Sequence, residues 1–319
     1  MNFVQQMKAK VLAGGEITLE EAIQLYQTPD AEELYAAANE IREHFAGRRG
    51  ELCSIMAAKT GACPEDCQFC AQSAHYSTGV VPAPLVKEEE ALSLARRRER
   101  EGVHRFSLVT SGRRLSAAEF AAILAIYRTL RQETGISLCA SLGEITPDEA
   151  LSLKEAGVTR YHHNLEACRS FFPRICSTHT YDDRLRTIAA VRQAGLELCC
   201  GGIIGLGESL AERFMLAMEI KATGAVSVPV NVLNPIPGTP LADRPILPPE
   251  EVLRTMAVFR FILPRAFIRF AGGRPLLGNA FARGFSAGVN ATITGDYLTT
   301  PGLQVKDDRI IMTQAGLLL

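Results

Sequence analysis

Along most of this chain, short apolar runs rich in β-branched residues alternate with longer stretches whose apolar residues recur at helical spacing. The alternation begins near Gly50 and is typical of repeated βα units. The expected strands are the eight runs Leu52–Ala57, His104–Val109, Ile136–Leu142, Thr159–Leu165, Leu196–Ile204, Ser227–Val232, Ala266–Phe270 and Ala291–Thr294. Eight strands predict an α/β fold, a (β/α)8 barrel of the TIM type. A doubly wound open sheet remains the alternative, because counting βα units does not show closure.

Local signals support the helices between these strands. Ser116 and Thr146 stand where a hydroxyl can cap a helix N-terminus, and Gly157 stands where a helix is expected to end. The first ~45 residues also show helical spacing. We therefore expect three parts, namely a helical extension at residues 1–48, a barrel at 49–302 and a C-terminal tail at 303–319.

The composition is that of an ordinary globular protein with a small-molecule substrate. Hydrophobic residues make up 47% and charged residues 22% of the 319 positions, and the formal net charge is -1. Interspersed charges of both signs give no electrostatic footprint for nucleic acid, and no uncharged run approaches the ~20 residues that span a bilayer. Nine cysteines without a secretory signal favour metal chemistry over disulfides, so we expect a cytoplasmic protein with no nucleic-acid or membrane partner.

The densest chemical signal is a polar loop just after the first expected strand. Cys63, Cys67 and Cys70 lie within eight residues. Thiolates at this spacing suit one compact site, because they are the soft, anionic donors that iron–sulfur clusters prefer. Structural zinc is the alternative, but it usually takes four protein ligands in paired knuckles, and no second knuckle stands nearby. Three cysteines leave one iron of a four-iron cluster without a protein ligand, which is the open position that a reactive cofactor requires.

This loop carries a family resemblance. The spacing C-x3-C-x2-C with the aromatic Phe69 before the last cysteine resembles radical S-adenosylmethionine (SAM) enzymes, in which the open iron of a [4Fe-4S] cluster chelates SAM. The longer string CPEDCQFCAQS, followed by Tyr76 and Thr78-Gly79, resembles the biotin synthase family in particular. The resemblance continues through nearly the whole chain after Gly50.

The resemblance implies an enzyme that converts dethiobiotin to biotin. An electron would cleave SAM, and 5′-deoxyadenosyl radicals would take hydrogen from two carbons before sulfur is inserted between them. Flavodoxin or ferredoxin as electron donor and a homodimer are further implications. The alternatives are a related radical SAM barrel such as an [FeFe]-hydrogenase maturase-like enzyme, or a non-catalytic cluster- or zinc-binding protein.

Several residues at the ends of expected strands are candidates for ligand contact. Strand alternation puts His162, Asn164 and Glu166 on one face, which we expect to look inward. The resemblance gives Asn164 and Glu166 contacts with the nucleoside or substrate, and it gives Asn231 a contact with the ureido ring of dethiobiotin. His162 stands where an asparagine is usual and Glu166 where an aspartate is usual, and we expect His162 to face the substrate too. The Gly-rich segment expected to cradle SAM contributes Gly201, Gly202 and Gly205.

The resemblance also implies an auxiliary iron–sulfur cluster, a [2Fe-2S] cluster or a variant, held deep in the barrel by three cysteines and an arginine. Cys139, Cys199 and Arg269 stand at matching positions, but Ser107 stands at the fourth. Barrel interiors are built in layers from alternate strands, so strands three, five and seven imply a partner on strand one. Cys53 lies there, and we hypothesise that it replaces the missing thiolate.

Three cysteines remain outside these sets. Cys176, in the loop after the fourth expected strand, is a reserve ligand for either cluster. Cys200 is expected to face the helices, and Cys168 has no motif that recommends it. Cys200 is expected to serve packing.

Overall fold

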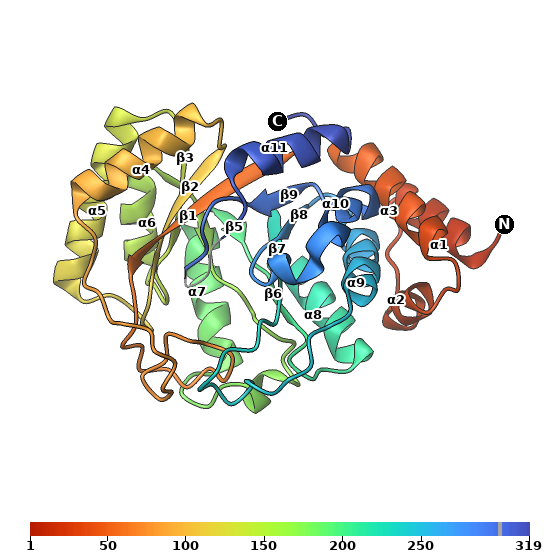
Figure 1. Cartoon of the computed structure of the whole chain (residues 1–319), viewed down its shortest axis with the longest axis horizontal. Coiled ribbons are helices and arrows are strands. Elements are labelled where there is room, and N and C mark those ends of the chain that lie inside the picture. The colour runs from red at the N-terminus through yellow and green to blue at the C-terminus, as the bar shows by residue number, and fades with distance from the viewer. Residues whose placement is uncertain (299–301) are drawn as a thin grey trace.

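In the computed structural model, which describes residues 1–298 and 302–319, parallel strands close into a barrel (Figure 1). The strands are β1 (Glu51–Lys59), β2 (Arg105–Thr110), β3 (Ser137–Ser141), β4 (Val158–His162), β5 (Glu197–Cys199), β6 (Gly202–Ile204), β7 (Ser227–Val232), β8 (Phe267–Phe270) and β9 (Ala291–Ile293). Their order is β5-β4-β3-β2-β1-β9-β8-β7-β6, and a pairing of β5 with β7 completes the ring. The predicted (β/α)8 barrel is confirmed, and the open sheet is excluded.

At the fifth strand position of this barrel the chain forms two short strands, β5 and β6, where the sequence predicts one continuous strand. Both β5 and β6 pair with β7, so the nine strands occupy eight positions around the ring. At the break, the Gly201 amide donates to Asn164 Oδ1 at 2.9 Å. A Cβ atom on Gly201 would lie 1.8 Å from the Pro229 carbonyl oxygen, so only glycine allows this close approach of the two strands.

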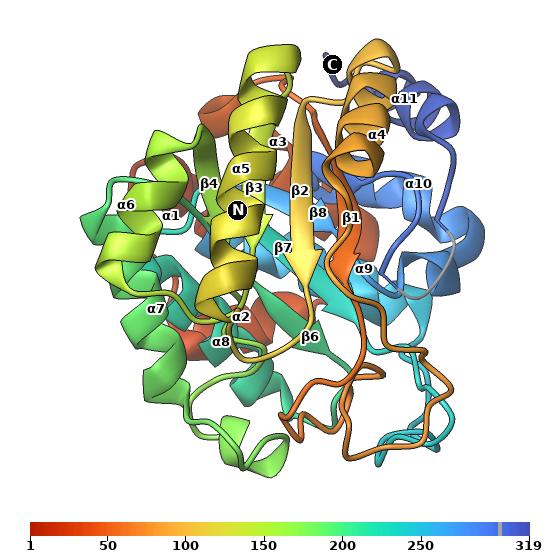
Figure 2. The same ribbon diagram turned by 90° about the vertical axis from the view of Figure 1, so that its left-hand side faces the viewer.

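An outer layer of helices covers the barrel (Figure 2). It consists of α4 (Glu88–Arg100), α5 (Ala117–Glu133), α6 (Pro147–Glu155), α7 (Tyr181–Gln193), α8 (Leu210–Thr223) and α9 (Pro249–Ile262). Ser116 and Thr146 form the expected N-caps, and each belongs to a reciprocal capping box with the glutamate three residues later. The apolar faces of these helices and the outward side chains of the strands make one continuous core.

Further helices pack at the two ends of the chain. The N-terminal helices α1 (Phe3–Leu12), α2 (Leu19–Tyr26) and α3 (Ala31–Ala46) lie together on one side of the barrel, where α2 contacts α8 and α3 contacts α9 (Figure 1). Between β8 and β9 the chain forms two 3-10 segments, Arg274–Ala280 and Phe285–Ala287, with α10 (Phe281–Gly284) between them.

The last helix, α11 (Val305–Gln314), is tied to the barrel by a buried ion pair. Arg274 Nη1 lies 2.9 Å from Asp308 Oδ1, and both side chains are almost fully buried. Among the described residues, none of the helices has the length and apolar character of a bilayer span.

All strands are parallel, so their carboxyl ends meet at one rim. The arrowhead of β2 in Figure 2 points to this rim, where long loops gather. They are the loop 60–87 after β1, the loop 163–180 after β4 and the loop 233–248 after β7. Residues from these loops and from the strand interiors form the cavities described next.

Candidate active site

The three-cysteine loop lies at the carboxyl end of β1 and is fixed by its own backbone. The Cys63 amide donates to the Gln72 carbonyl at 3.0 Å, and the Ala74 amide donates to the Cys63 carbonyl at 2.8 Å. A tight turn follows, in which the Cys70 amide donates to the Cys67 carbonyl at 2.9 Å. These bonds hold the three cysteines in a short, folded segment at the rim.

The thiols of this segment line a cavity of about 220 Å³ that accepts a polar occupant. Cys63, Cys67 and Cys70 all contribute to its wall. Thr110 Oγ1 and His163 Nε2, which belong to residues of the same wall, are buried and have no hydrogen-bond partner among the described residues. Buried polar atoms are normally paired, so this cavity is built for a ligand with polar groups. Three thiol donors and unpaired polar atoms fit a metal cluster with a polar cofactor beside it.

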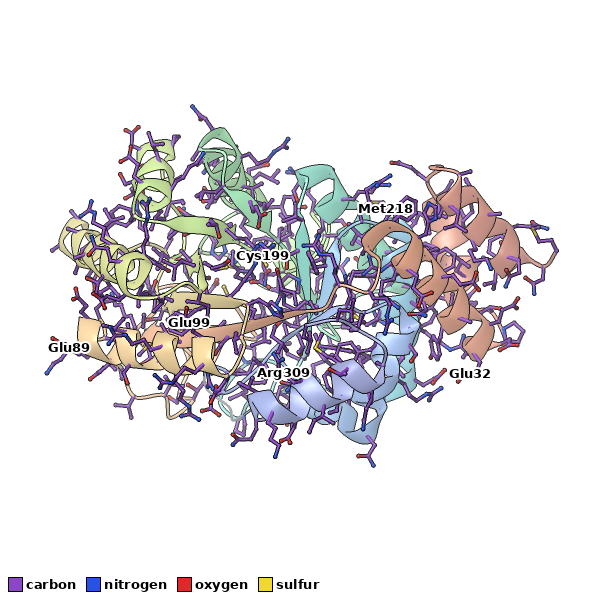
Figure 3. The ribbon with its side chains drawn as sticks, turned by 90° about the horizontal axis from the view of Figure 1, so that it is seen from above. Glu32, Glu89, Glu99, Cys199, Met218 and Arg309 are labelled. Atoms are coloured by element: carbon purple, nitrogen blue, oxygen red, sulfur yellow. The ribbon has the colours of Figure 1, made fainter. Side chains whose placement is uncertain are left out.

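A second cavity of about 400 Å³ runs from this loop into the barrel. Cys53, Cys139 and Cys199 line its floor, together with Ser107 and Arg269. Seen from above, Cys199 lies within the ring of strands (Figure 3). The two cavities share wall residues, among them Phe69, Cys70, Gln72, His162, Asn164 and Glu166. A ligand held at the cysteine loop would therefore face one held deep in the barrel.

Cys53 points into this barrel cavity because its neighbours on β1 point outward. The adjacent Ser54 is fully buried against the helix layer, where its Oγ accepts a hydrogen bond from Arg98 of α4 at 3.0 Å. Strand alternation therefore directs Cys53 inward, where it lines the same wall as Cys139. Ser107 lies opposite Cys139 in the strand register, and its buried hydroxyl has no partner in the part of the chain that the structure describes.

The thiols of the floor lie in a positively charged setting. A hydrogen bond with Cys139 and the charges of Arg269 and Arg160 lower the pKa of Cys53 to about 6, although burial acts in the opposite direction. Burial also tends to raise the pKa of Cys199, but a hydrogen bond with His162 and nearby positive charges lower it overall. The thiolate, the form that binds iron, is thus favoured at Cys53 and Cys199, whereas the contact with Cys53 and burial raise the pKa of Cys139.

Arg269 reaches the floor but is already engaged by protein groups. Its Nη2 is paired with the Glu51 carboxylate, its Nε lies 3.3 Å from Ser227 Oγ, and its Nη1 lies 3.3 Å from the Thr292 carbonyl oxygen. Arg160 Nη1 also lies 2.6 Å from Glu51 Oε1. The role of Arg269 as a cluster ligand stays a prediction, and iron would compete there with the Glu51 carboxylate.

The predicted inward face of β4 is formed by the end of the strand and the residues after it. Asn164 Nδ2 donates to Glu166 Oε2 at 3.2 Å, and Glu166 itself has a positive φ of 66°. A non-glycine residue in this conformation is uncommon, and such residues concentrate at functional sites. His162 Nδ1 lies 3.5 Å from Cys199 Sγ. Burial lowers the pKa of His162, but the Cys199 thiol and the Glu166 carboxylate raise it overall.

Asn231 at the end of β7 lines the barrel cavity and also holds two strand ends in place. Its Oδ1 accepts from the Gly272 amide at 2.8 Å, and its Nδ2 donates to the Gly202 carbonyl at 3.1 Å. An amide oxygen can accept a second bond, and its nitrogen has a second proton. Asn231 therefore keeps one donor and one acceptor position for a ligand.

The Gly-rich segment after β5 is shaped mainly by contacts within the protein. A Cβ atom on Gly202 would lie 2.7 Å from the Glu166 carbonyl oxygen, and the Gly205 amide donates to Glu208 Oε1 at 2.9 Å. Ile203 is the member of this segment that lines the barrel cavity. The expected SAM contacts of Gly201, Gly202 and Gly205 stay a prediction.

Comparison with known proteins agrees with this arrangement. The family model of the Radical SAM superfamily matches residues 58–219, and the model of the Biotin and Thiamin Synthesis associated domain matches residues 229–318. The chain is 51% identical over 318 residues to the biotin synthase of Acetivibrio thermocellus, covering 99% of each protein. It is 49% identical over 319 residues to that of Clostridioides difficile (strain 630), covering 98% of each. The chain belongs to the biotin synthase family.

Solved structures confirm the fold of this family member. Methylornithine synthase superposes with a TM-score of 0.84 at 18% identity, covering 98% of this chain and 96% of that one. The FeFe-hydrogenase maturase from Carboxydothermus hydrogenoformans superposes with a TM-score of 0.82 at 17% identity, covering 99% of this chain and 78% of that one. At such identities the likeness concerns the barrel alone.

Sequence reasoning missed several residues of this biotin synthase family site. Glu51 and Arg160 form part of the charged floor, and Glu65, within the cysteine loop, is paired with His179. A usable signal existed for Arg160, because a charged residue inside a predicted buried strand needs a partner, whereas Glu51 lies one residue before its predicted strand. Glu65 and His179 gave no such signal, because they lie in loops.

The remaining cysteines are separated by the fold. Cys176 lies against Cys67 behind the cysteine loop, with 3.8 Å between the two sulfur atoms, and it is not among the residues that line the barrel cavity. Cys168 and Cys200 are fully buried in the hydrophobic core. Burial raises the pKa of Cys200 well above its usual range, as expected for a packing residue.

Proposed function

We propose that this chain is a radical SAM sulfurtransferase that converts dethiobiotin to biotin. The observation that carries the proposal is the pair of joined cavities, with three thiols at the rim and three more on the barrel floor. Sulfur insertion needs a radical source on one side of the substrate and a sulfur source on the other. Membership of the biotin synthase family supports the same substrate.

In this proposal Cys63, Cys67 and Cys70 hold a [4Fe-4S] cluster whose fourth iron binds SAM. When bound, the cluster and SAM supply the electron and the 5′-deoxyadenosyl group for hydrogen abstraction from carbon. Phe69, which lines both cavities, would pack beside the cofactor. The Gly201, Gly202 and Gly205 segment would support SAM from the other wall, with Ile203 in contact.

The wall shared by the two cavities would position the reacting groups. Asn164 and Glu166 offer an amide and a carboxylate to the ribose hydroxyls or to the substrate, and both face the cavities. Asn231 has a free donor and a free acceptor position, which match the carbonyl and N–H groups of a urea. His162 would contact the substrate from below, near Cys199. Holding the carbon next to the radical source while excluding water is the protein's part of catalysis.

Cys53, Cys139 and Cys199 are the thiolates that we propose for the auxiliary cluster, with Arg269 as fourth ligand. Cys53 takes the place left by Ser107, whose hydroxyl is a poor iron ligand. Arg269 would then share its guanidinium between iron and Glu51. The cluster is a [2Fe-2S] cluster or a variant of it, which supplies the inserted sulfur.

The electron donor and the assembly are proposed from the family resemblance, and the compartment is proposed from the free thiols. We propose flavodoxin or ferredoxin as the electron donor, a homodimer as the assembly and the cytoplasm as the compartment. The nine cysteines are all unpaired thiols, as a reducing compartment would keep them. Residues 1–48, 49–302 and 303–319 would serve as helical extension, catalytic barrel and tail.

The test is an anaerobic turnover assay. Purified protein reconstituted with iron and sulfide is incubated with dethiobiotin, SAM and a reductant, and products are identified by mass spectrometry. We expect biotin together with methionine and 5′-deoxyadenosine. Methionine and 5′-deoxyadenosine without biotin, in protein with a full auxiliary cluster, would contradict the proposed substrate.

A further inference from the structure

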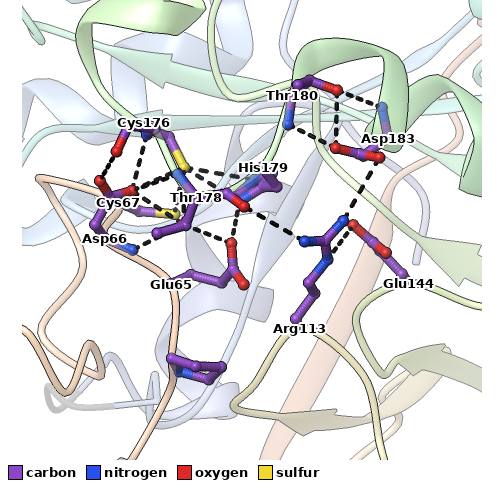
Figure 4. A network of polar contacts seen from close by, with 12 residues as sticks. Glu65, Asp66, Cys67, Arg113, Glu144, Cys176, Thr178, His179, Thr180 and Asp183 are labelled. Atoms are coloured by element: carbon purple, nitrogen blue, oxygen red, sulfur yellow. Dashed lines mark hydrogen bonds and ion pairs between the residues drawn. The ribbon is translucent and has the colours of Figure 1, made fainter.

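A polar network behind the cysteine loop joins Cys67 to the segment after β4 (Figure 4). Cys67 Sγ lies 3.8 Å from Cys176 Sγ, and Cys176 Sγ lies 3.1 Å from His179 Nδ1. All three side chains are buried. Their sulfur and nitrogen atoms lie within 4.8 Å of one another, a spacing that could hold a metal ion or a set of hydrogen bonds.

The partners of His179 decide between these two uses. Arg184 Nη2 lies 2.8 Å from His179 Nε2, and a guanidinium can only donate, so Nε2 is the acceptor. The proton of the neutral ring is therefore on Nδ1, which is paired with the Glu65 carboxylate. A protonated Nδ1 offers no lone pair to a metal. His179 is thus a member of a hydrogen-bond network rather than a ligand.

The same network fixes the position of Cys176 relative to Cys67. Asp66 Oδ1 accepts from the Ser177 amide at 2.9 Å and from the Thr178 amide at 3.1 Å. Asp66 is the residue directly before Cys67, so these bonds attach the segment of Cys176 to the cluster loop itself. The sulfur–sulfur contact therefore rests on several independent hydrogen bonds.

Thr178 Oγ1 lies 3.7 Å from Cys176 Sγ, but it already donates to Glu65 and accepts from the Asp66 amide. Two further acceptors lie within reach of the Cys176 thiol proton. One is Asp66 Oδ1 at 3.3 Å, which already accepts two amide bonds. The other is Cys67 Sγ. A cysteine that binds iron is a thiolate, so the proton of this pair belongs to Cys176 when Cys67 holds the cluster. The Cys67 sulfur is then the acceptor with the greater unused capacity.

We propose that Cys176 is a positioning residue that donates an S–H···S hydrogen bond to the cluster sulfur of Cys67 and so makes the cluster easier to reduce. A donor to a ligating sulfur stabilises the reduced cluster, which carries the extra negative charge. The inference rests on the proposed role of Cys67 as a ligand, but not on dethiobiotin as the substrate.

The experiment compares Cys176→Ala and Cys176→Ser with the unchanged chain after anaerobic reconstitution. Redox titration is followed by electron paramagnetic resonance, and the signal that changes on addition of SAM identifies this cluster in the presence of the auxiliary one. We expect the ratio of reduced to oxidised cluster in the alanine variant, at one fixed potential, to be about fivefold lower, the effect of one lost hydrogen bond. The serine variant should recover part of this loss because its hydroxyl also donates.

Cys168→Ala is the matched control, because Cys168 is a buried cysteine whose sulfur lies 3.3 Å from Ser170 Oγ and not beside a cluster ligand. Its cluster should titrate as in the unchanged chain. Since alanine could weaken packing, Cys176→Val and Cys176→Thr provide a second pair of equal shape that differs in the hydroxyl donor. We expect the threonine variant to be reduced more easily than the valine variant.

Equal potentials in the alanine variant and the unchanged chain, with full iron content, would overturn the proposal, because the Cys176 thiol would then not donate to the Cys67 sulfur. Loss of the SAM-responsive signal from both the alanine and the valine variants, with its retention in the serine variant, would also overturn it, because Cys176 would then serve cluster retention. All readings are taken without dethiobiotin. A failure to form biotin would therefore leave this result unaffected.

Discussion

Cys53 and Ser107 are the residues at which the auxiliary floor can be tested most directly. Both line the barrel cavity together with Cys139, but only Cys53 carries a thiol. A thiolate binds iron far better than a hydroxyl does. The choice of ligand therefore depends on which of these two positions holds sulfur.

We predict that Cys53→Ala loses the iron and sulfide of the auxiliary cluster but keeps the SAM-binding cluster. Iron and sulfide analysis with Mössbauer spectroscopy would measure this loss, and SAM cleavage should continue. Adding Ser107→Cys to this variant should restore part of the auxiliary iron, because the new sulfur lies opposite Cys139. Ser107→Cys alone is the control. Unchanged auxiliary iron in Cys53→Ala would contradict the proposed ligand set.

At the scale of elements, one buried carboxylate links strands from across the barrel. Glu51 at the start of β1 is paired with Arg105 of β2, Arg160 of β4 and Arg269 of β8. Burial raises the pKa of Glu51, but the three guanidinium groups lower it to about 2 overall. The carboxylate thus joins β1 to its neighbour β2 and also to β4 and β8, which do not neighbour β1 in the sheet.

We predict that Glu51→Gln lowers the free energy of unfolding by about 3 kcal/mol at neutral pH, because it leaves buried arginines without their counter-charge. The folded-state pKa of Glu51 lies below its usual value of 4.5, so its contribution is complete above that pH and is lost as the pH falls toward 2. Urea unfolding of both proteins across this range would measure the difference. A difference that is independent of pH would show that packing, and not charge, is responsible.

The elements also show what sequence could and could not predict. The Ser116 and Thr146 caps are local signals carried by four consecutive residues, and both were correctly predicted. The break after β5 was not, because it depends on the close approach of Gly201 to Pro229 on another strand. A periodicity of apolar residues contains no information about such an approach.

At the scale of the whole molecule, closure of the barrel brings distant segments together. The thiols of Cys63, Cys67 and Cys70 could be assigned to one site because they are close in sequence. The contact of Cys67 with Cys176 joins residues 109 positions apart, and the sequence left Cys176 as a reserve ligand for either cluster. The loops after β1 and β4 meet only because the barrel closes with its strands in register. The sequence of one loop does not show which other loop it will contact.

The closed barrel places the cysteine loop at the rim and the three floor cysteines inside, with a shared cavity wall between them. A substitution that removes the cluster at one of these sites should therefore leave the cluster at the other in place. We predict that Cys139→Ala still forms 5′-deoxyadenosine from SAM in the presence of dethiobiotin but yields no biotin, because the radical source at the rim is intact and the sulfur source is lost. Cys70→Ala should do the reverse, retaining auxiliary iron and cleaving no SAM. Both products would be measured by chromatography with mass spectrometry, alongside iron content.

Cys200→Ala is the control for this separation, because Cys200 is buried in the core next to Cys199 without lining either described cavity. It should keep both clusters and both products. If Cys139→Ala still made biotin, sulfur would come from elsewhere than the barrel floor. If Cys70→Ala lost all iron, the two sites would assemble as one unit, and the shared wall of His162, Asn164 and Glu166 would be a structural link between them rather than a chamber for the substrate.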